Sequence, residues 1–209
     1  MPAALVLGLV LLGWLGVRHL NGRRAPILIG LVVLLLAVGG VVEVRWRTME
    51  GRYTAATREL LDRPDAEVVC ERLSAAMFNV RNRAGYVRWT EDGSKPKRAD
   101  LTWDTCRDVR AWERSGQTAE DLDRVIAVHV LTHEAMHLAG HYGEAEAECL
   151  AMQHDSEMAR LLGATPENAD ALARSFWVNV YPRMPGDYVS AGCTADGPLD
   201  ESPGDQLWP

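Results

Sequence analysis

Two apolar runs fill most of the first 44 residues. Residues 3–17 are apolar, residues 26–42 are apolar again, and the segment between them, 18–24, carries three arginines. Runs of this length are typical of membrane-spanning helices, the first being near the lower limit. A signal peptide normally begins with positive charge, which is missing here. The pattern therefore predicts a transmembrane helical hairpin over residues 1–44, with a cleaved leader or a buried hydrophobic hairpin as the alternatives.

The arginines between the runs predict the orientation of the chain. Short loops rich in arginine stay in the cytoplasm, so both chain ends and everything after residue 44 are expected to face outward. The arginine-rich residues 45–64 are predicted to form a juxtamembrane stalk, and residues 65–209 a single domain, which is long enough for its own core. The prediction is a cell-membrane protein with two spans and an extracytoplasmic domain.

The sequence His133-Glu134-Ala135-Met136-His137 predicts a metal site. Helical residues four apart lie on the same face, so His133 and His137 can bind one ion. Glu134 between them can act as the general base on a zinc-activated water. The apolar residues 122–131 predict that this helix is buried, and Gly140 predicts its end. The alternative is a set of satisfied core histidines, and structural or surface roles are also predicted for His129, His141 and His154.

A second helix-forming segment, residues 144–153, follows a short loop. Glu144 and Glu148 lie one turn apart in it and can face the same side. A catalytic zinc needs a third protein ligand and an open position for water. A tight turn at Gly140 would bring Glu144 back as that ligand and Glu148 behind it as an acceptor for a ligand imidazole. Glu146 points away from both and is predicted to be solvated.

The combined pattern His133-Glu134-x-x-His137 and Glu144-x-x-x-Glu148 resembles the gluzincin metallopeptidases, in which HExxH precedes a helix carrying ExxxD. The resemblance implies a zincin-like domain with these roles: zinc ligands His133, His137 and Glu144, general base Glu134, and Glu148 in the place of the orienting aspartate. This chain departs from the family in a shorter gap before Glu144 and in having glutamate at position 148.

Two further resemblances concern the same region. Gly140 resembles the turn of the metzincins, HExxHxxGxxH, but their third histidine would fall on Gly143, which has no side chain to bind metal. The stretches HEAMHLAG, EAEAEC and ADGPLD, with the terminal WP, resemble an uncharacterised group of bacterial membrane-anchored proteins. That resemblance covers most of the soluble part and implies a metallopeptidase.

The cysteines are an even set without a C-x-x-C pair, which argues against a thiolate zinc site: Cys70, Cys106, Cys149 and Cys193. Disulfides persist outside the cytoplasm. Of three possible pairings, Cys70–Cys106 with Cys149–Cys193 keeps each bridge within its own half. The outward location predicts the Cys149–Cys193 bridge, which would hold the tail near the metal helices, with Tyr188 and residues 196–198 at the groove. Four buried thiols are the alternative.

The remaining patterns predict an α+β fold, a mainly helical zincin-like domain with a small β-hairpin or sheet. Helices are expected over residues 65–78, 104–114 and 166–181, besides the two motif helices, and residues 182–209 are expected to be irregular. Residues 85–90 and 98–103, separated by a polar turn, predict a β-hairpin. Its free edge is expected to bind substrate as an added strand.

Together these features predict a membrane-anchored zinc (Zn²⁺) metallopeptidase acting on a peptide or protein substrate. The net charge of −7, with scattered basic residues, gives no sign of nucleic-acid binding. The alternatives are a non-catalytic extracytoplasmic module that binds zinc or a partner, and a metallohydrolase for a non-peptide amide. A fourth protein ligand such as His141 would indicate a structural site. For the oxyanion, Tyr142, His141 and Tyr188 are the candidates.

Overall fold

The computed structural model describes residues 8–10, 13–14, 16, 25–72 and 84–204. The chain divides into two compact units, Met1–Met49 and Glu50–Pro209, each described by itself. The helices and strands occur in this order: α2 (Ala25–Leu61), β1 (Glu67–Cys70), β2 (Gly85–Val87), β3 (Arg98–Leu101), α4 (Trp103–Arg114), α5 (Leu122–Ala139), α6 (Glu144–Leu161), α7 (Pro166–Asn179), and the 3₁₀ turns η1 (Tyr181–Arg183) and η2 (Gly186–Tyr188).

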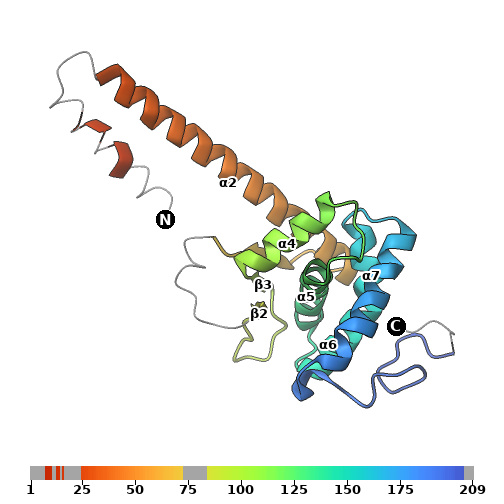
Figure 1. The fold of residues 1–209 in the computed structure, drawn as a ribbon. Helices are drawn as coiled ribbons and strands as arrows, with labels where there is room; N and C mark the ends of the chain where they lie inside the picture. Colours follow the sequence, from red (N-terminus) through yellow and green to blue (C-terminus); the bar gives the residue numbers. More distant parts are fainter. Residues whose placement is uncertain (1–7, 11–12, 15, 17–24, 73–83, 205–209) are drawn as a thin grey trace. The chain divides into compact units, whose positions relative to one another are not determined.

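The first unit contains the apolar part of the long helix α2 (Figure 1). Nine of its aliphatic side chains are at least half exposed: Ile29, Leu31, Val33, Leu34, Leu35, Val38, Val41, Val42 and Val44. Among the described residues, this is the one helix long and apolar enough to cross a membrane. The predicted run 26–42 is thus confirmed as an apolar helix. Most of the predicted first span, 3–17, and the arginine segment 18–24 lie outside the described residues, so the hairpin and its orientation stay predictions.

The predicted stalk, residues 45–64, falls on the last part of α2 and the residues after it, and from Glu50 onward it belongs to the second unit. Tyr53 is fully buried, and its hydroxyl donates to the carbonyl of Cys106 at 3.4 Å. Thr54 Oγ1 accepts the N–H of Val68 at 3.0 Å. Tyr53 thus links α2 to α4, and Thr54 links it to strand β1.

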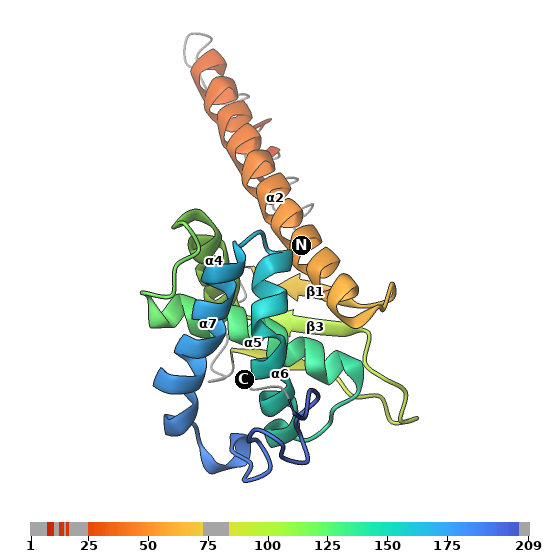
Figure 2. The same cartoon turned by 90° about the vertical axis from the view of Figure 1, so that its right-hand side faces the viewer.

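A three-stranded sheet of order β1-β3-β2 covers part of α5. β3 pairs antiparallel with β2, which confirms the predicted hairpin with shorter strands. On its other side, β3 pairs parallel with β1, as Figure 2 shows. The predicted helix 65–78 is wrong over residues 67–70, which form β1, and residues 73–78 lie outside the described residues. Val68 and Cys70 of β1 are both buried and alternate with more exposed neighbours, as a strand requires.

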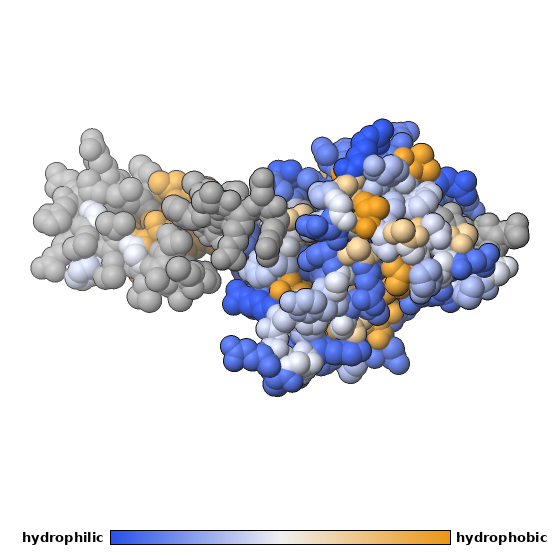
Figure 3. Space-filling model, turned by 90° about the horizontal axis from the view of Figure 1, so that it is seen from below, coloured by the Kyte–Doolittle hydropathy of each residue, from blue (hydrophilic) through white to orange (hydrophobic). Residues whose placement is uncertain are grey.

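Helix α5 lies at the centre of the second unit, against α4, α6, α7 and the sheet (Figure 1). The predicted helices 104–114 and 166–181 are confirmed as α4 and α7, the latter beginning with Thr165 as cap and Pro166 in its first turn. The fold is therefore mainly helical with a small sheet. On the face shown in Figure 3, hydrophilic residues predominate over this unit, and hydrophobic ones form small, separate patches.

Two disulfides, Cys70–Cys106 and Cys149–Cys193, confirm the predicted pairing that keeps each bridge within its own half. The second joins α6 to the irregular C-terminal segment. That segment is also held by hydrogen bonds between Gln153 and the backbone of Leu199 (2.8 Å) and Glu201 (2.9 Å).

Candidate metal centre

The centre is built on the hairpin formed by α5 and α6. Asp121 caps the start of α5 by accepting the N–H of Arg124. Gly140 ends it in the left-handed conformation, with φ of 110°, as predicted. Only three residues, 141–143, then separate Gly140 from α6, so the first turn of α6 is brought back to the last turns of α5.

The three predicted zinc ligands converge at one point. His133 and His137 lie one turn apart on α5, with their ring centroids 4.6 Å apart. Their Nε2 atoms lie 3.1 and 3.3 Å from the same atom, Oε2 of Glu144. Two nitrogens and one oxygen at this spacing form a group that could hold a metal ion.

The contacts behind the rings place both Nε2 atoms on the side of Glu144, where a metal would bind. Nδ1 of His137 lies 2.7 Å from the carbonyl oxygen of His141, which can only accept, so Nδ1 carries the proton. Nδ1 of His133 lies 2.9 Å from Oε2 of Glu148, the acceptor that the sequence predicted. With Nδ1 of each ring held from behind, both Nε2 atoms face Glu144, the orientation that histidine ligands need. The residues present therefore fit a divalent metal ion.

Burial differs across the ligand set. The His133 and His137 side chains are 8% and 6% exposed, whereas that of Glu144 is 46% exposed. Burial, followed by the neighbouring His133, lowers the pKa of His137. The hydrogen bond from His133 is the main cause that lowers the pKa of Glu144. The carboxylate is therefore ionised and accessible from solvent on one side of the cluster.

Glu134, the predicted base, is buried where α5 packs against Gly85, the first residue of β2. It is 4% exposed, and a methyl group on Gly85 would lie 2.7 Å from its Oε1 atom. No side chain larger than hydrogen fits between strand β2 and this carboxylate.

A buried chain of acids and imidazoles extends from His133 into the core. Oε1 of Glu148 lies 3.2 Å from Nε2 of His129, whose Nδ1 lies 2.8 Å from Oδ2 of Asp155. Burial alone would lower the pKa of His129, but the two carboxylates raise it to about 10. Burial likewise opposes the ionised form of Glu148, but His129 and His133 lower its pKa to about 2. The chain therefore consists of carboxylates and an imidazolium that neutralise one another in part.

Aromatic rings flank the metal ligands on two sides. Trp89 meets His137 edge-on at 5.9 Å between centroids and packs against Tyr142 at 4.8 Å. Tyr142 itself is 73% exposed. The ring of Tyr188, from the C-terminal segment, lies 5.8 Å from that of His133. Of the oxyanion candidates, Tyr188 thus lies beside a ligand ring, whereas Tyr142 reaches the cluster only through Trp89.

The other predicted residues lie apart from the ligand set. Nδ1 of His141 pairs with Glu146 at 2.9 Å, and both side chains are partly exposed. His154 pairs with Glu157 and Glu201. Among the described residues, no contact places the 196–198 turn at the cluster; Asp196 and Gly197 bond within the C-terminal segment, whereas Leu199 and Glu201 bond to Gln153 of α6.

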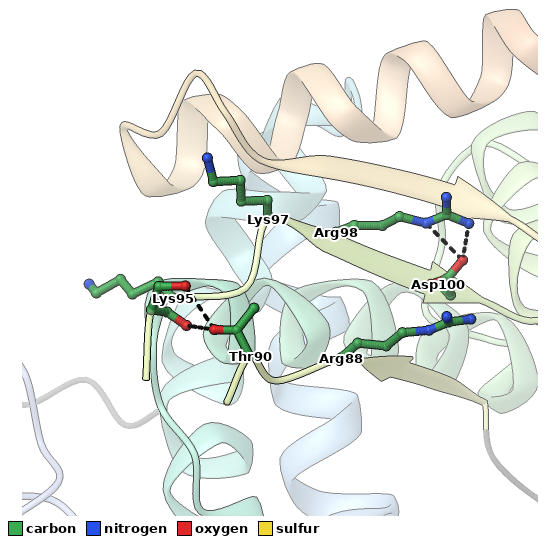
Figure 4. A pocket seen from close by; sticks show the side chains of 7 residues that line it. Arg88, Thr90, Lys95, Lys97, Arg98 and Asp100 are labelled. Atoms are coloured by element: carbon green, nitrogen blue, oxygen red, sulfur yellow. Dashed lines mark hydrogen bonds and ion pairs between the residues drawn. The ribbon is translucent and has the colours of Figure 1, made fainter. Parts of the chain in front are cut away.

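A pocket of about 320 Å³ lies on the β2–β3 hairpin, lined by Arg88, Thr90, Ser94, Lys95, Lys97, Arg98 and Asp100. Figure 4 shows that its cationic groups do not converge: Arg88 and Arg98 extend toward Asp100, whereas Lys95 and Lys97 point away from them. Arg98 is already paired with Asp100. The pocket is therefore a charged surface with no single point where an anion would meet all four cations.

Comparison of the chain with models of protein families, with curated proteins and with solved structures found no match. The function must therefore be inferred from the geometry of the centre.

Sequence reasoning missed the role of Asp155 and the contact between Gly85 and Glu134. A signal for the first was present, since His129, His133 and His137 recur every four residues and Glu148 and Asp155 are seven apart, both helical spacings. The second joins residues that are far apart in the sequence and carries no local signal.

Proposed function

We propose that the protein is a membrane-anchored zinc metallopeptidase. The observation that carries the proposal is the convergence of two Nε2 atoms and the Glu144 carboxylate, each imidazole being held from behind by an acceptor at Nδ1. A zinc ion bound there would act as a Lewis acid toward a scissile carbonyl and a water molecule.

In this proposal, Glu134 is the general base. Its carboxylate follows His133 directly in α5 and is held against Gly85. It would take a proton from the attacking water and deliver it to the leaving amine. Burial at this position restricts the carboxylate to a place beside His133 and Gly85.

The strand next to Glu134 suggests how a peptide would bind. Among the described strands, β2 lies at one edge of the sheet and begins at Gly85. An extended peptide that pairs with β2 would run past Glu134, with main-chain hydrogen bonds providing affinity. Trp89 and Tyr142 would then contact the side chains of that peptide near His137. A peptide fits this strand-like mode better than a small non-peptide amide does.

One contact favours an enzyme over a purely structural zinc site. A structural site needs four protein ligands, and His141 was the candidate for the fourth. Its ring is paired with Glu146 instead, and only its carbonyl contacts the cluster, through Nδ1 of His137. Three protein ligands with a partly exposed Glu144 leave access for water, as catalysis requires.

The test uses the full chain purified in detergent. We expect about one zinc per chain in metal analysis, and cleavage of members of a peptide library. Glu134→Gln should retain zinc and the fold but lose about a hundredfold to ten-thousandfold in turnover. Glu146→Gln, an exposed neighbour, serves as control and should retain activity. Unchanged turnover in Glu134→Gln, or zinc-loaded protein that cleaves no peptide, would favour the non-catalytic module.

Location is part of the same proposal: α2 anchors the chain, and the second unit faces the outside of the cell. The two disulfides support that side, because they persist outside the cytoplasm. A reporter that is active only in the cytoplasm, fused after Pro209, should stay silent. A strong signal from it would reverse the orientation.

A further inference from the structure

We infer that Asp155 and His129 are positioning residues for the metal centre: acting through Glu148, they hold the imidazole of His133 with Nε2 turned toward the ion. The inference rests on the proposed metal site but not on peptide cleavage.

The first support is an unbroken series of contacts. From Asp155 Oδ2 to His129 Nδ1 is 2.8 Å, from His129 Nε2 to Glu148 Oε1 is 3.2 Å, and from Glu148 Oε2 to His133 Nδ1 is 2.9 Å. Acid and imidazole alternate along it, so each close contact is an ion pair, and the one between Asp155 and His129 is also a hydrogen bond. Both oxygens of Glu148 are engaged, one by each histidine, and this fixes the plane of its carboxylate.

The second support is the cost of burying these groups. Asp155, Glu148 and His129 are 0%, 1% and 2% exposed. Buried charged groups are usually less favourable for stability than apolar residues of similar volume. A core that served only stability would gain nothing from three of them in series. Their retention next to a metal ligand is explained if they orient that ligand and keep negative charge behind it, which strengthens its bond to a cation.

A third support comes from another helix. The ring of Phe176 on α7 stacks on that of His129, with centroids 3.4 Å apart and planes 14° apart. Asp155 contacts Nδ1 of the His129 ring and Glu148 contacts its Nε2, while Phe176 packs on the face of the ring. These three contacts restrict the orientation of His129. Because Glu148 contacts both rings, a fixed His129 also restricts the orientation of Glu148 and, through it, of His133.

The same cluster admits a competing interpretation. His129, His133 and Glu148 could themselves hold a metal ion. An ion there would take Nδ1 of His133, which would then have to bind two ions through its two nitrogens and lose both protons. A series of ion pairs needs no such deprotonation, so we favour positioning. The metal content of the protein separates the two interpretations.

The experiment measures zinc affinity by chelator competition on the full chain in detergent. Asp155→Asn keeps the shape of the side chain and removes its charge. We expect zinc affinity to fall by about tenfold, the lower end of the effect of removing partners behind a ligand. Asp170→Asn is the matched control, because Asp170 is an exposed acid that pairs with Arg160 away from the centre; it should bind zinc like the wild type.

A double-mutant cycle distinguishes positioning from general destabilisation. Glu148→Gln interrupts the series, so adding Asp155→Asn to it should cost no further zinc affinity, although both changes lower the unfolding temperature of the metal-free protein. If Asp155→Asn does not fold, His129→Gln takes its place in the cycle. Additive losses of affinity, or wild-type affinity in Asp155→Asn, would overturn the inference.

The remaining outcomes separate this inference from the proposed function. If metal analysis finds two zinc ions per chain, and His129→Gln loses one of them but keeps the other, His129 is a ligand of a second metal site and the positioning role is wrong. Coupling in the cycle together with an absence of peptide cleavage would support positioning and contradict the peptidase.

Discussion

Gly85 on β2 lies against the carboxylate of Glu134 on α5, closer than any side chain would allow. A methyl group at position 85 would lie 2.7 Å from Oε1, 2.8 Å from Cγ and 2.9 Å from Cδ of Glu134. The hydroxyl of Thr105 donates to the neighbouring carbonyl of Ala84 at 2.8 Å, which holds the strand in place. The sheet therefore sets the position of the proposed base, which the helix alone does not determine.

Replacing Gly85 by alanine should displace the base without removing the metal. Because the methyl group cannot fit, the Glu134 side chain must rotate. We expect unchanged zinc content and a loss of turnover approaching that of Glu134→Gln, of about a hundredfold or more. Gly51→Ala is the control, because no atom lies within 4 Å of a methyl group there. Full turnover in Gly85→Ala would show that this contact does not position the base.

Glu144 should be the third ligand, and Glu146 provides a closely matched comparison. Both side chains are 46% exposed and belong to the first turn of α6, but only Glu144 meets His133 and His137. Glu144→Ala should lose most of the zinc measured by metal analysis, whereas Glu146→Ala should keep it. Equal zinc contents in the two variants would contradict the ligand assignment.

The metal-free protein should be most stable in mildly acidic solution. Folding raises the pKa of His129 from 6.5 to about 10, so its contribution is fully present below pH 6.5 and is lost as pH rises through 10. Folding lowers the pKa of Glu148 from 4.5 to about 2, so its contribution is present above pH 4.5 and is lost as pH falls through 2. Burial opposes both shifts, and the opposite charges cause them.

Unfolding free energies of the full chain, measured with chelator present, should therefore be largest between about pH 4.5 and 6.5. On the alkaline side, each group that is protonated in the folded state and deprotonated in the unfolded state lowers the unfolding free energy by up to about 1.4 kcal/mol per pH unit. His129→Gln should reduce that slope, with the remainder coming from His133, whose pKa is raised to about 9 by its hydrogen bonds to Glu144 and Glu148 against the effect of burial. An unchanged slope in this variant would mean that His129 is not protonated in the folded state.

Removing the Cys149–Cys193 bridge should destabilise the second unit. The bridge joins residues 44 apart, which corresponds to about 4 kcal/mol in the chain-entropy model. The double variant Cys149→Ala, Cys193→Ala should therefore unfold roughly 8–16 °C lower than the wild type in a thermal scan. Peptide mapping without reductant should recover Cys149 linked to Cys193 from the wild type. Recovery of both as free thiols would remove the basis of this prediction.

The convergence of the three proposed ligands could be predicted from sequence because its geometry is local. The four-residue spacing of His133 and His137, the stop at Gly140 and the helix that begins at Glu144 each follow from short-range rules. The bridges follow less directly, since four cysteines allow three pairings and only the expected outward location favours Cys149–Cys193.

What could not be predicted depends on contacts between distant residues. Local patterns predict a helix over residues 67–70, which become strand β1 only by pairing with β3, more than thirty positions later in the chain. Asp155 faces His129 across 26 positions, and Gly85 meets Glu134 only where the sheet packs on α5. In each case the packing of the elements selects the partner, and no periodicity within one element reveals it.

The proposed metal ligands and the buried acids behind them all come from α5 and α6, two helices joined by the four residues 140–143. Bringing them together closes only a short loop, and the entropic cost of closure rises with loop length. Such contacts belong to the early part of folding, before the sheet, the C-terminal segment and their disulfides are in place. The chain would therefore acquire its affinity for zinc first, and the residues that position the base and line the approach to the centre would be added around an existing site.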